Sequence, residues 1–75
     1  MKIDDWMSRI YKADLRGNRE AEAAEFKDAL GEDTALTTAA MLKLKDLDDL
    51  IAARGEGACA YSSKYRVYLR EALTP

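Results

Sequence analysis

Few residues in this chain could carry out chemistry, and none of them is a histidine. Ser62, Ser63 and Lys64 could form a serine and lysine pair for nucleophilic attack, and Cys59 could act as a thiolate if nearby charge lowered its pKa. The chain lacks the side chain that proteins use most often as a general base and as a metal ligand. Both serines directly precede a helical pattern, which is typical of helix caps, and a lone cysteine is usually a small apolar filler. We therefore expect no catalytic residue and no enzymatic activity.

Adjacent carboxylates and closely spaced glycines are the other candidates for a chemical site. Three carboxylate pairs occur, at Asp4/Asp5, Glu32/Asp33 and Asp48/Asp49. Neighbouring residues on a helix do not face each other, so these pairs do not predict a shared proton. The acids at Asp46, Asp48 and Asp49 lack the glycine and the terminal glutamate of a calcium loop. Gly55 and Gly57 lack the third glycine and the following lysine of a phosphate-binding loop. We expect no metal and no cofactor.

Glycines divide the chain into segments that could form helices. Gly17, Gly31 and the Gly55/Gly57 pair each follow an apolar run, where glycine usually ends a helix. The 75 residues fit one domain. The pattern predicts an all-α fold over residues 1–75: a small bundle of three to four helices with short connections and antiparallel neighbours.

The first half of the chain predicts two helices. In residues 3–16, apolar side chains recur every three or four positions, at Ile3, Trp6, Met7, Ile10, Tyr11 and Ala13. Asp14 falls inside this apolar arc, so either the helix ends before it or its carboxylate pairs with a neighbouring element. Asn18 can cap a second helix over residues 19–30 that ends at Gly31.

The second half predicts a polar connection over residues 31–38 and then a long helix to Arg54. Four side chains could cap this helix: Asp33, Thr34, Thr37 and Thr38. Its apolar stripe contains Leu36, Ala40, Leu44, Leu47, Leu50 and Ile51. Residues 58–61 could be extended or a loop. Ser62 or Ser63 would cap a last helix, with one side formed by Tyr61, Tyr65, Tyr68, Leu69 and Ala72.

Composition limits the class of protein. A chain this short buries only about 60% of its unfolded surface, so its small core favours a homo-oligomer or a bound partner. Its N-terminus does not predict a secretory signal, no segment approaches about 18 consecutive apolar residues, and one cysteine fits a reducing compartment. We expect a cytoplasmic protein with no membrane partner. The net charge is −2, and the central third of the chain is acidic whereas both ends are basic.

Two groups of residues are candidates for contact with a protein partner. Leu42, Asp46 and Asp49 lie opposite the apolar stripe of the long helix, and an exposed leucine among acids is typical of a small contact surface. On the last helix the basic residues are Lys64, Arg66 and Arg70. The tyrosines point to another side and are expected to pack inward with their hydroxyls at the boundary.

These features favour a non-enzymatic protein-binding module, an inhibitor or adaptor that docks onto a larger protein. Phage-encoded inhibitors of host defence, such as anti-CRISPR proteins, are small acidic single-domain proteins of this kind, an analogy of size and character. One alternative is a nucleic-acid-binding protein that uses the basic last helix. A helix-turn-helix is disfavoured, because its small and apolar positions hold Lys27 and Glu32. The other alternative is a self-assembling structural subunit.

Overall fold

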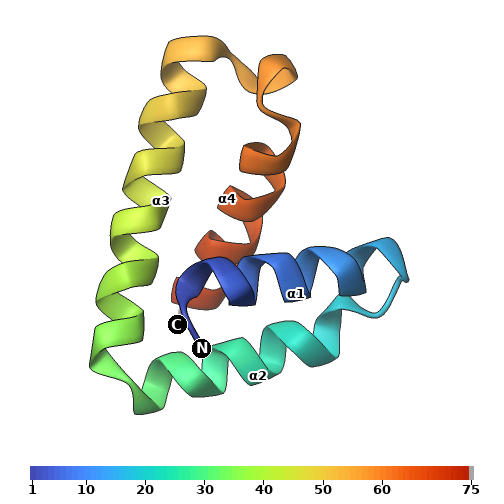
Figure 1. Cartoon of the computed structure of the whole chain (residues 1–75), viewed down its shortest axis with the longest axis vertical. Coiled ribbons are helices and arrows are strands. Elements are labelled where there is room, and N and C mark those ends of the chain that lie inside the picture. The colour runs from blue at the N-terminus through green and yellow to red at the C-terminus, as the bar shows by residue number, and fades with distance from the viewer. Residues whose placement is uncertain (75) are drawn as a thin grey trace.

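The structure is a computed structural model that describes residues 1–74. In chain order it contains α1 (Ile3–Leu15), α2 (Arg19–Glu32), α3 (Thr34–Arg54), the 3₁₀ turn η1 (Glu56–Ala58) and α4 (Ala60–Leu73). Figure 1 shows α1 and α2 as one antiparallel pair and α3 and α4 as a second, with α1 crossing in front of the C-terminal half of α4. The predicted all-α bundle is confirmed, with four helices.

α1 ends at Gly17, as predicted. Gly17 has φ 77°, in the left-handed region that glycine adopts without steric cost. The N–H of Gly17 donates to the carbonyl of Asp14 and the N–H of Asn18 to that of Ala13, each at 3.0 Å. This pair of bonds is a Schellman motif, which satisfies two carbonyls at the end of the helix.

The prediction that Gly31 ends the second helix is wrong. α2 continues through Gly31 to Glu32, and the single residue Asp33 connects it to α3. Asp33 is extended, its N–H donates to the carbonyl of Ala29 at 3.0 Å, and its Oδ1 accepts from the N–H of Leu36 at 3.1 Å. One residue thus ends α2 and caps α3, so residues 31–38 form no polar connection and no left-handed glycine is needed.

The predicted start of the last helix is also wrong. Gly55, with φ 84°, ends α3, the η1 turn follows, and α4 begins at Ala60 instead of after Ser62 or Ser63. The carbonyl of Cys59 accepts the first helical bond, from the N–H of Ser63 at 2.8 Å. Cys59 is buried, as the filler interpretation predicted, and it directly precedes the first residue of α4, Ala60.

The core lies where the two helix pairs meet. Met7 and Ile10 from α1, Phe26 from α2 and Leu69 from α4 are almost completely buried, and Trp6 packs against Phe26 with ring centroids 5.3 Å apart. α3 contributes its predicted stripe, with buried residues Leu36, Ala40, Leu47 and Ile51 and half-buried Leu44 and Leu50. Each fully buried large apolar side chain stabilises the fold by about 1.5–3 kcal/mol, so this cluster is the main source of stability.

Ion pairs join the helices around this core. Arg9 of α1 reaches two acids of α2, with its Nε 2.7 Å from Oε2 of Glu22 and its Nη2 2.6 Å from Oε2 of Glu25. Two further pairs join α1 to α3 and α2 to α4: Asp4 with Lys43 at 3.1 Å, and Arg19 with Glu71 at 3.5 Å. Exposed pairs of this kind contribute about 0.2–1 kcal/mol each, so they orient the helices more than they stabilise them.

Gly17 follows α1, whereas Gly31 lies within α2. Alanine at these two positions should therefore shift stability in opposite directions. Gly17→Ala should lower the free energy of unfolding by about 1–2 kcal/mol, because the left-handed backbone penalises a Cβ. Gly31→Ala should raise it by about 0.5–1 kcal/mol, because alanine is the better helix former. Neither added Cβ would meet an atom within 4 Å, so the backbone conformation alone decides whether the free energy of unfolding rises or falls. Urea unfolding of both variants measures this, and a loss of stability in Gly31→Ala would contradict the continuous α2.

Candidate protein-binding surfaces

Leu42, Asp46 and Asp49 lie together on the outer side of α3. All three are exposed, Leu42 to 60%, and their spacing of four and three residues places them on one helix face. Asp49 pairs with Lys45 on the same helix at 3.4 Å, and Asp46 has no ion pair among residues 1–74. These three residues, the acidic α3 face, are available to a partner.

A shallow groove runs beside the acidic α3 face, between α3 and the end of α4. It has a volume of about 580 Å³ and is lined by Thr37, Met41, Leu44, Lys45, Asp48, Asp49 and Leu73. Met41 is as exposed as Leu42 and extends the apolar surface. A helical wheel does not identify Met41 as exposed. Met41 lies on the flank of the apolar stripe of α3, where the exposure of a side chain depends on how much of it α4 covers.

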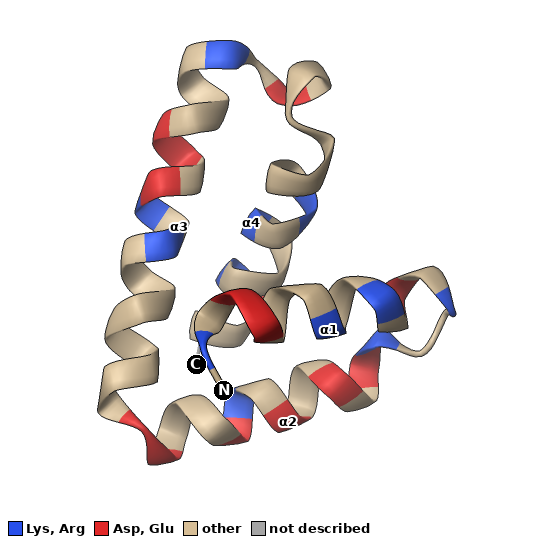
Figure 2. Ribbon diagram, viewed as in Figure 1, with Lys and Arg blue, Asp and Glu red and all other residues tan. Residues whose placement is uncertain are grey.

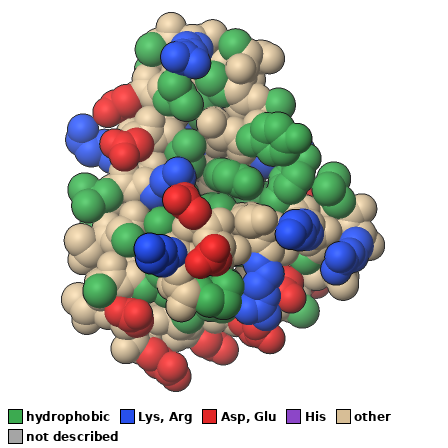
Figure 3. Space-filling model, in the orientation of Figure 1, with side chains coloured by type: hydrophobic (Ala, Val, Ile, Leu, Met, Phe, Trp, Pro, Cys, Tyr) green, Lys and Arg blue, Asp and Glu red, His purple; other side chains and the backbone are tan. Residues whose placement is uncertain are grey.

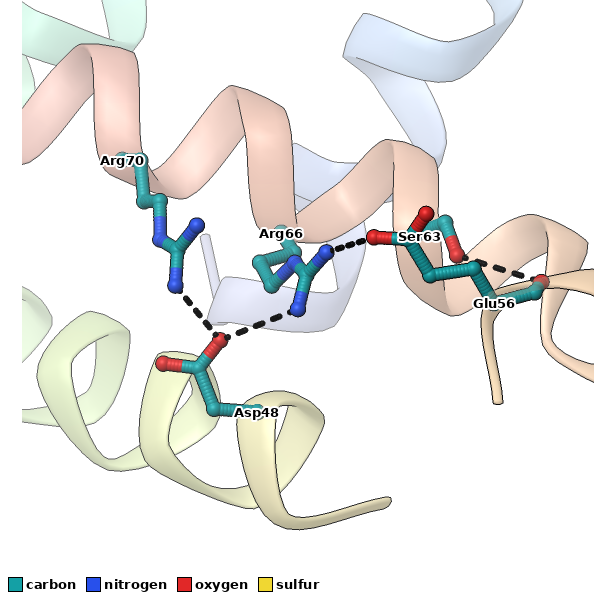
Figure 4. Close-up of polar contacts among 5 residues, drawn as sticks. All are labelled: Asp48, Glu56, Ser63, Arg66 and Arg70. Carbon is teal, nitrogen blue, oxygen red and sulfur yellow. Dashed lines mark hydrogen bonds and ion pairs between the residues drawn. The ribbon is translucent and has the colours of Figure 1, made fainter. Parts of the chain in front are cut away.

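The three basic residues of α4 do not form one surface. Arg66 and Arg70 point toward α3, where Oδ1 of Asp48 lies 3.6 Å from Nη1 of Arg66 and 3.0 Å from Nη2 of Arg70 (Figure 4). Arg66 also pairs with Glu56 of η1, and its side chain is only 18% exposed. Figure 4 shows these side chains converging between α3, η1 and α4, so they join elements of the fold.

Lys64 lies on the other flank of α4, toward α1. Its Nζ is 3.9 Å from Oδ2 of Asp14, and the same Oδ2 accepts a hydrogen bond from the hydroxyl of Tyr68 at 2.5 Å. Asp14 therefore pairs with an adjacent helix, one of the two outcomes expected for a carboxylate inside the apolar arc of α1. The guanidinium of Arg19 lies over the Tyr68 ring, 5.4 Å from its centroid. These contacts hold α4 against the turn between α1 and α2.

Aromatic side chains form a further surface between α1 and α4. The Tyr11 ring packs edge-on against Tyr61 and Tyr65, with centroid distances of 5.2 Å and 6.2 Å. Leu15 follows Tyr11 by one helical turn and is 69% exposed. We call Tyr11, Leu15, Tyr61 and Tyr65 the tyrosine patch. Figure 3 shows hydrophobic side chains gathered over the N-terminal part of α4 and the C-terminal part of α1, with Lys and Arg side chains beside them.

The prediction that Tyr61 packs inward with the other tyrosines of the last helix is wrong. Tyr68 is buried and Tyr65 half-buried, but Tyr61 is 63% exposed. Tyr61 lies in the first turn of α4, outside the core cluster, and its ring contacts that of Tyr11. The early start of α4 at Ala60 places Tyr61 on the helix and at its exposed end, a boundary that the serine-cap prediction missed.

Two phenol pKa values are raised in this region. For Tyr68 the main cause is burial, followed by the hydrogen bond to Asp14 and the charge of that carboxylate. For Tyr11 the main cause is desolvation, followed by neighbouring Tyr61. A phenol with its ordinary pKa of about 10 is already protonated at neutral pH, and these shifts move its ionisation further from neutrality.

Among residues 1–74 there is no group of three or more His, Cys, Asp or Glu side chains that could hold a metal ion. Within the same residues no helix is both long enough and apolar enough to cross a bilayer. The chain matches no protein-family model, no curated protein and no solved structure.

Removing the Asp48 carboxylate, which Arg66 and Arg70 share, should weaken the fold. Removing the exposed carboxylate of Asp46 should not. Asp48→Asn should lower the free energy of unfolding by about 0.5–1 kcal/mol, because both Arg66 and Arg70 lose their common partner. Asp46→Asn is the matched control, with no ion pair to lose. Urea unfolding at low salt and at about 1 M salt measures the difference, which should shrink as salt screens the pairs. Equal effects of the two variants would show that the Asp48 pairs do not stabilise α3 against α4.

Stability should fall at high pH because of Tyr68. Its folded pKa lies above the unfolded value of 10.0, so from about pH 10 upward the folded state binds more protons than the unfolded state and loses stability as the pH rises. Tyr68→Phe should flatten this loss, at a cost of about 1.5 kcal/mol at neutral pH for the hydrogen bond to a carboxylate. Asp14→Asn should shift the last step of an ultraviolet tyrosine titration to lower pH. A titration unchanged by Asp14→Asn would contradict the Tyr68 to Asp14 bond.

Proposed function

We propose that this chain is a non-enzymatic protein-binding module that docks onto a larger protein through the tyrosine patch and thereby blocks or bridges it. The observation that carries the proposal is the exposure of Tyr61, a large aromatic side chain that lies outside the core and is held by the Tyr11 ring. Tyrosine is enriched among the residues that contribute most to protein interfaces. Tyr61 lies outside the core cluster, and an exposed aromatic ring beside other apolar side chains is typical of a binding surface.

The geometry of the patch favours tight binding. Tyr11 and Tyr65 are half-buried and packed against the core, so their rings are already ordered before a partner arrives. Ordering side chains on association costs about 0.5–1.5 kcal/mol each, and a pre-ordered patch avoids part of that cost. The phenol hydroxyls add hydrogen-bonding capacity at the edge of an apolar surface.

The acidic α3 face is a second candidate surface, because Leu42 and Met41 are both about 60% exposed beside Asp46 and Asp49. A protein with two such surfaces could act as an adaptor. The nucleic-acid alternative is less favoured, since Arg66 and Arg70 are both paired with Asp48 of α3. Self-assembly would place a second copy on one of the same two surfaces.

Truncating Tyr61, the most exposed tyrosine, should weaken binding. Tyr61→Ala should weaken the complex by about 30-fold, the effect of losing an interface residue worth about 2 kcal/mol. Val67→Ala is the matched control, because Val67 lies on the same helix, is 44% exposed and is not part of the patch. The partner is captured from host lysate with the wild-type chain, identified by mass spectrometry, and its dissociation constants are measured with purified variants.

A third variant separates the two surfaces. The triple variant combines Leu42→Ala, Asp46→Lys and Asp49→Lys. If the tyrosine patch makes the contact, its affinity for the captured partner should stay within about twofold of the wild-type affinity. Loss of binding in this variant with full binding in Tyr61→Ala would move the contact to the acidic α3 face. The absence of any saturable partner would contradict the proposal.

A further inference from the structure

The tyrosine patch has positive charge along its border. Lys12 follows Tyr11 in the last turn of α1, and Arg16 follows Leu15 directly after the end of α1. Both are exposed with no ion pair among residues 1–74. Lys64 lies between Tyr61 and Tyr65 in sequence, and its side chain is about half exposed, 3.9 Å from Asp14. Asp14 already accepts the Tyr68 hydroxyl bond, and it is the acid that pairs with Lys64 among residues 1–74.

This positive border differs from the surroundings of the other cations near α1. Arg9 is engaged by Glu22 and Glu25, and Arg19 by Glu71. Figure 2 shows the contrast: Lys and Arg lie toward the C-terminal end of α1 and the following turn, whereas acids predominate along α2. Cations near the C-terminus of a helix are favoured by its dipole, which helps to explain Lys12 and Arg16 on α1 but not Lys64 in the first half of α4. In a chain of net charge −2, this corner is locally basic.

We propose that the tyrosine patch takes an acidic peptide segment of a partner protein, with an aromatic or aliphatic side chain anchored on the rings and carboxylates facing Lys12, Arg16 and Lys64. The inference rests on the proposed function and names the chemistry of the partner. Charge complementarity at the border steers association and excludes basic segments, while the buried apolar anchor supplies most of the affinity.

A peptide fits the patch better than a nucleic acid does. Single-stranded nucleic acids stack bases on open aromatic faces along a basic groove. Here the Tyr11 ring packs edge-on against the Tyr61 and Tyr65 rings, so part of each ring is occupied by its neighbour.

Selection from a random peptide library tests the proposal without a known partner. A displayed library of peptides about 12 residues long is selected on the wild-type chain at low salt, and binders retained by Tyr61→Ala are discarded. The remaining peptides should carry net negative charge together with at least one Trp, Phe or Leu. The double variant Lys12→Glu/Arg16→Glu should weaken them by about tenfold or more, mainly through slower association.

Arg54→Glu is the matched control. Arg54 is an exposed cation at the end of α3 with no ion pair among residues 1–74, and its reversal should change affinity by less than about twofold. Thermal unfolding of each variant verifies that the charge reversals leave the fold intact.

The outcomes separate the inference from the proposed function. Two results would overturn the acidic partner but not the binding surface. One is that the Tyr61-dependent peptides are neutral or basic, and the other is that Lys12→Glu/Arg16→Glu does not change their affinity. A library without any Tyr61-dependent peptide would overturn both. A single-stranded oligonucleotide that binds more tightly than the selected peptides in fluorescence anisotropy, with the same dependence on Tyr61 and Lys12, would replace the peptide as the occupant.

Discussion

Four helices in 75 residues can bury only one small apolar cluster, and the rest of the structure depends on how they share it. Met7, Phe26 and Leu69 bring large side chains from α1, α2 and α4, whereas the completely buried residue of α3 is the small Ala40. A small residue at this point lets the backbone of α3 approach the cluster closely. Since every pair of α-helices is in contact, a change in one crossing would alter the others. The positions of all surface groups follow from this packing.

The same packing decides which charges remain available. Asp48 lies between Arg66 and Arg70 because α3 and α4 run side by side, and Arg9 reaches α2 because α1 and α2 are antiparallel. Asp48 and Arg9 face a neighbouring helix and are paired across it, whereas Asp46 on the outer face of α3 has no ion pair among residues 1–74. For a chain this rich in charge, the distribution of unpaired charge is a better guide to a binding surface than the positions of charged residues in the sequence.

Four tyrosines show the transition from core to surface. Tyr68 is buried and bonded to Asp14, Tyr65 and Tyr11 are half-buried, and Tyr61 is mostly exposed. Successive rings lie 5.2–6.3 Å apart, so the exposed ring is linked to the core by aromatic contacts. An aromatic surface supported in this way is rigid, and a rigid aromatic surface beside unpaired cations is suited to an acidic and apolar partner segment.

The sequence by itself determined the helices and their outward faces. The spacing of apolar residues is a local property set by 3.6 residues per turn, and it correctly placed the buried stripe of α3 and the exposure of Leu42 opposite that stripe. The end of α1 was equally predictable, because only glycine adopts the left-handed conformation at Gly17 without cost. Gly31 stays within α2 because Asp33 both ends α2 and caps α3, a local arrangement that the glycine pattern did not predict. Only the tertiary structure decided that Asp48 binds two arginines and that the Tyr61 ring lies against Tyr11 outside the core. These two features depend on contacts between helices far apart in the chain, where the crossing of two helices, and not the period of either one, determines which side chains meet.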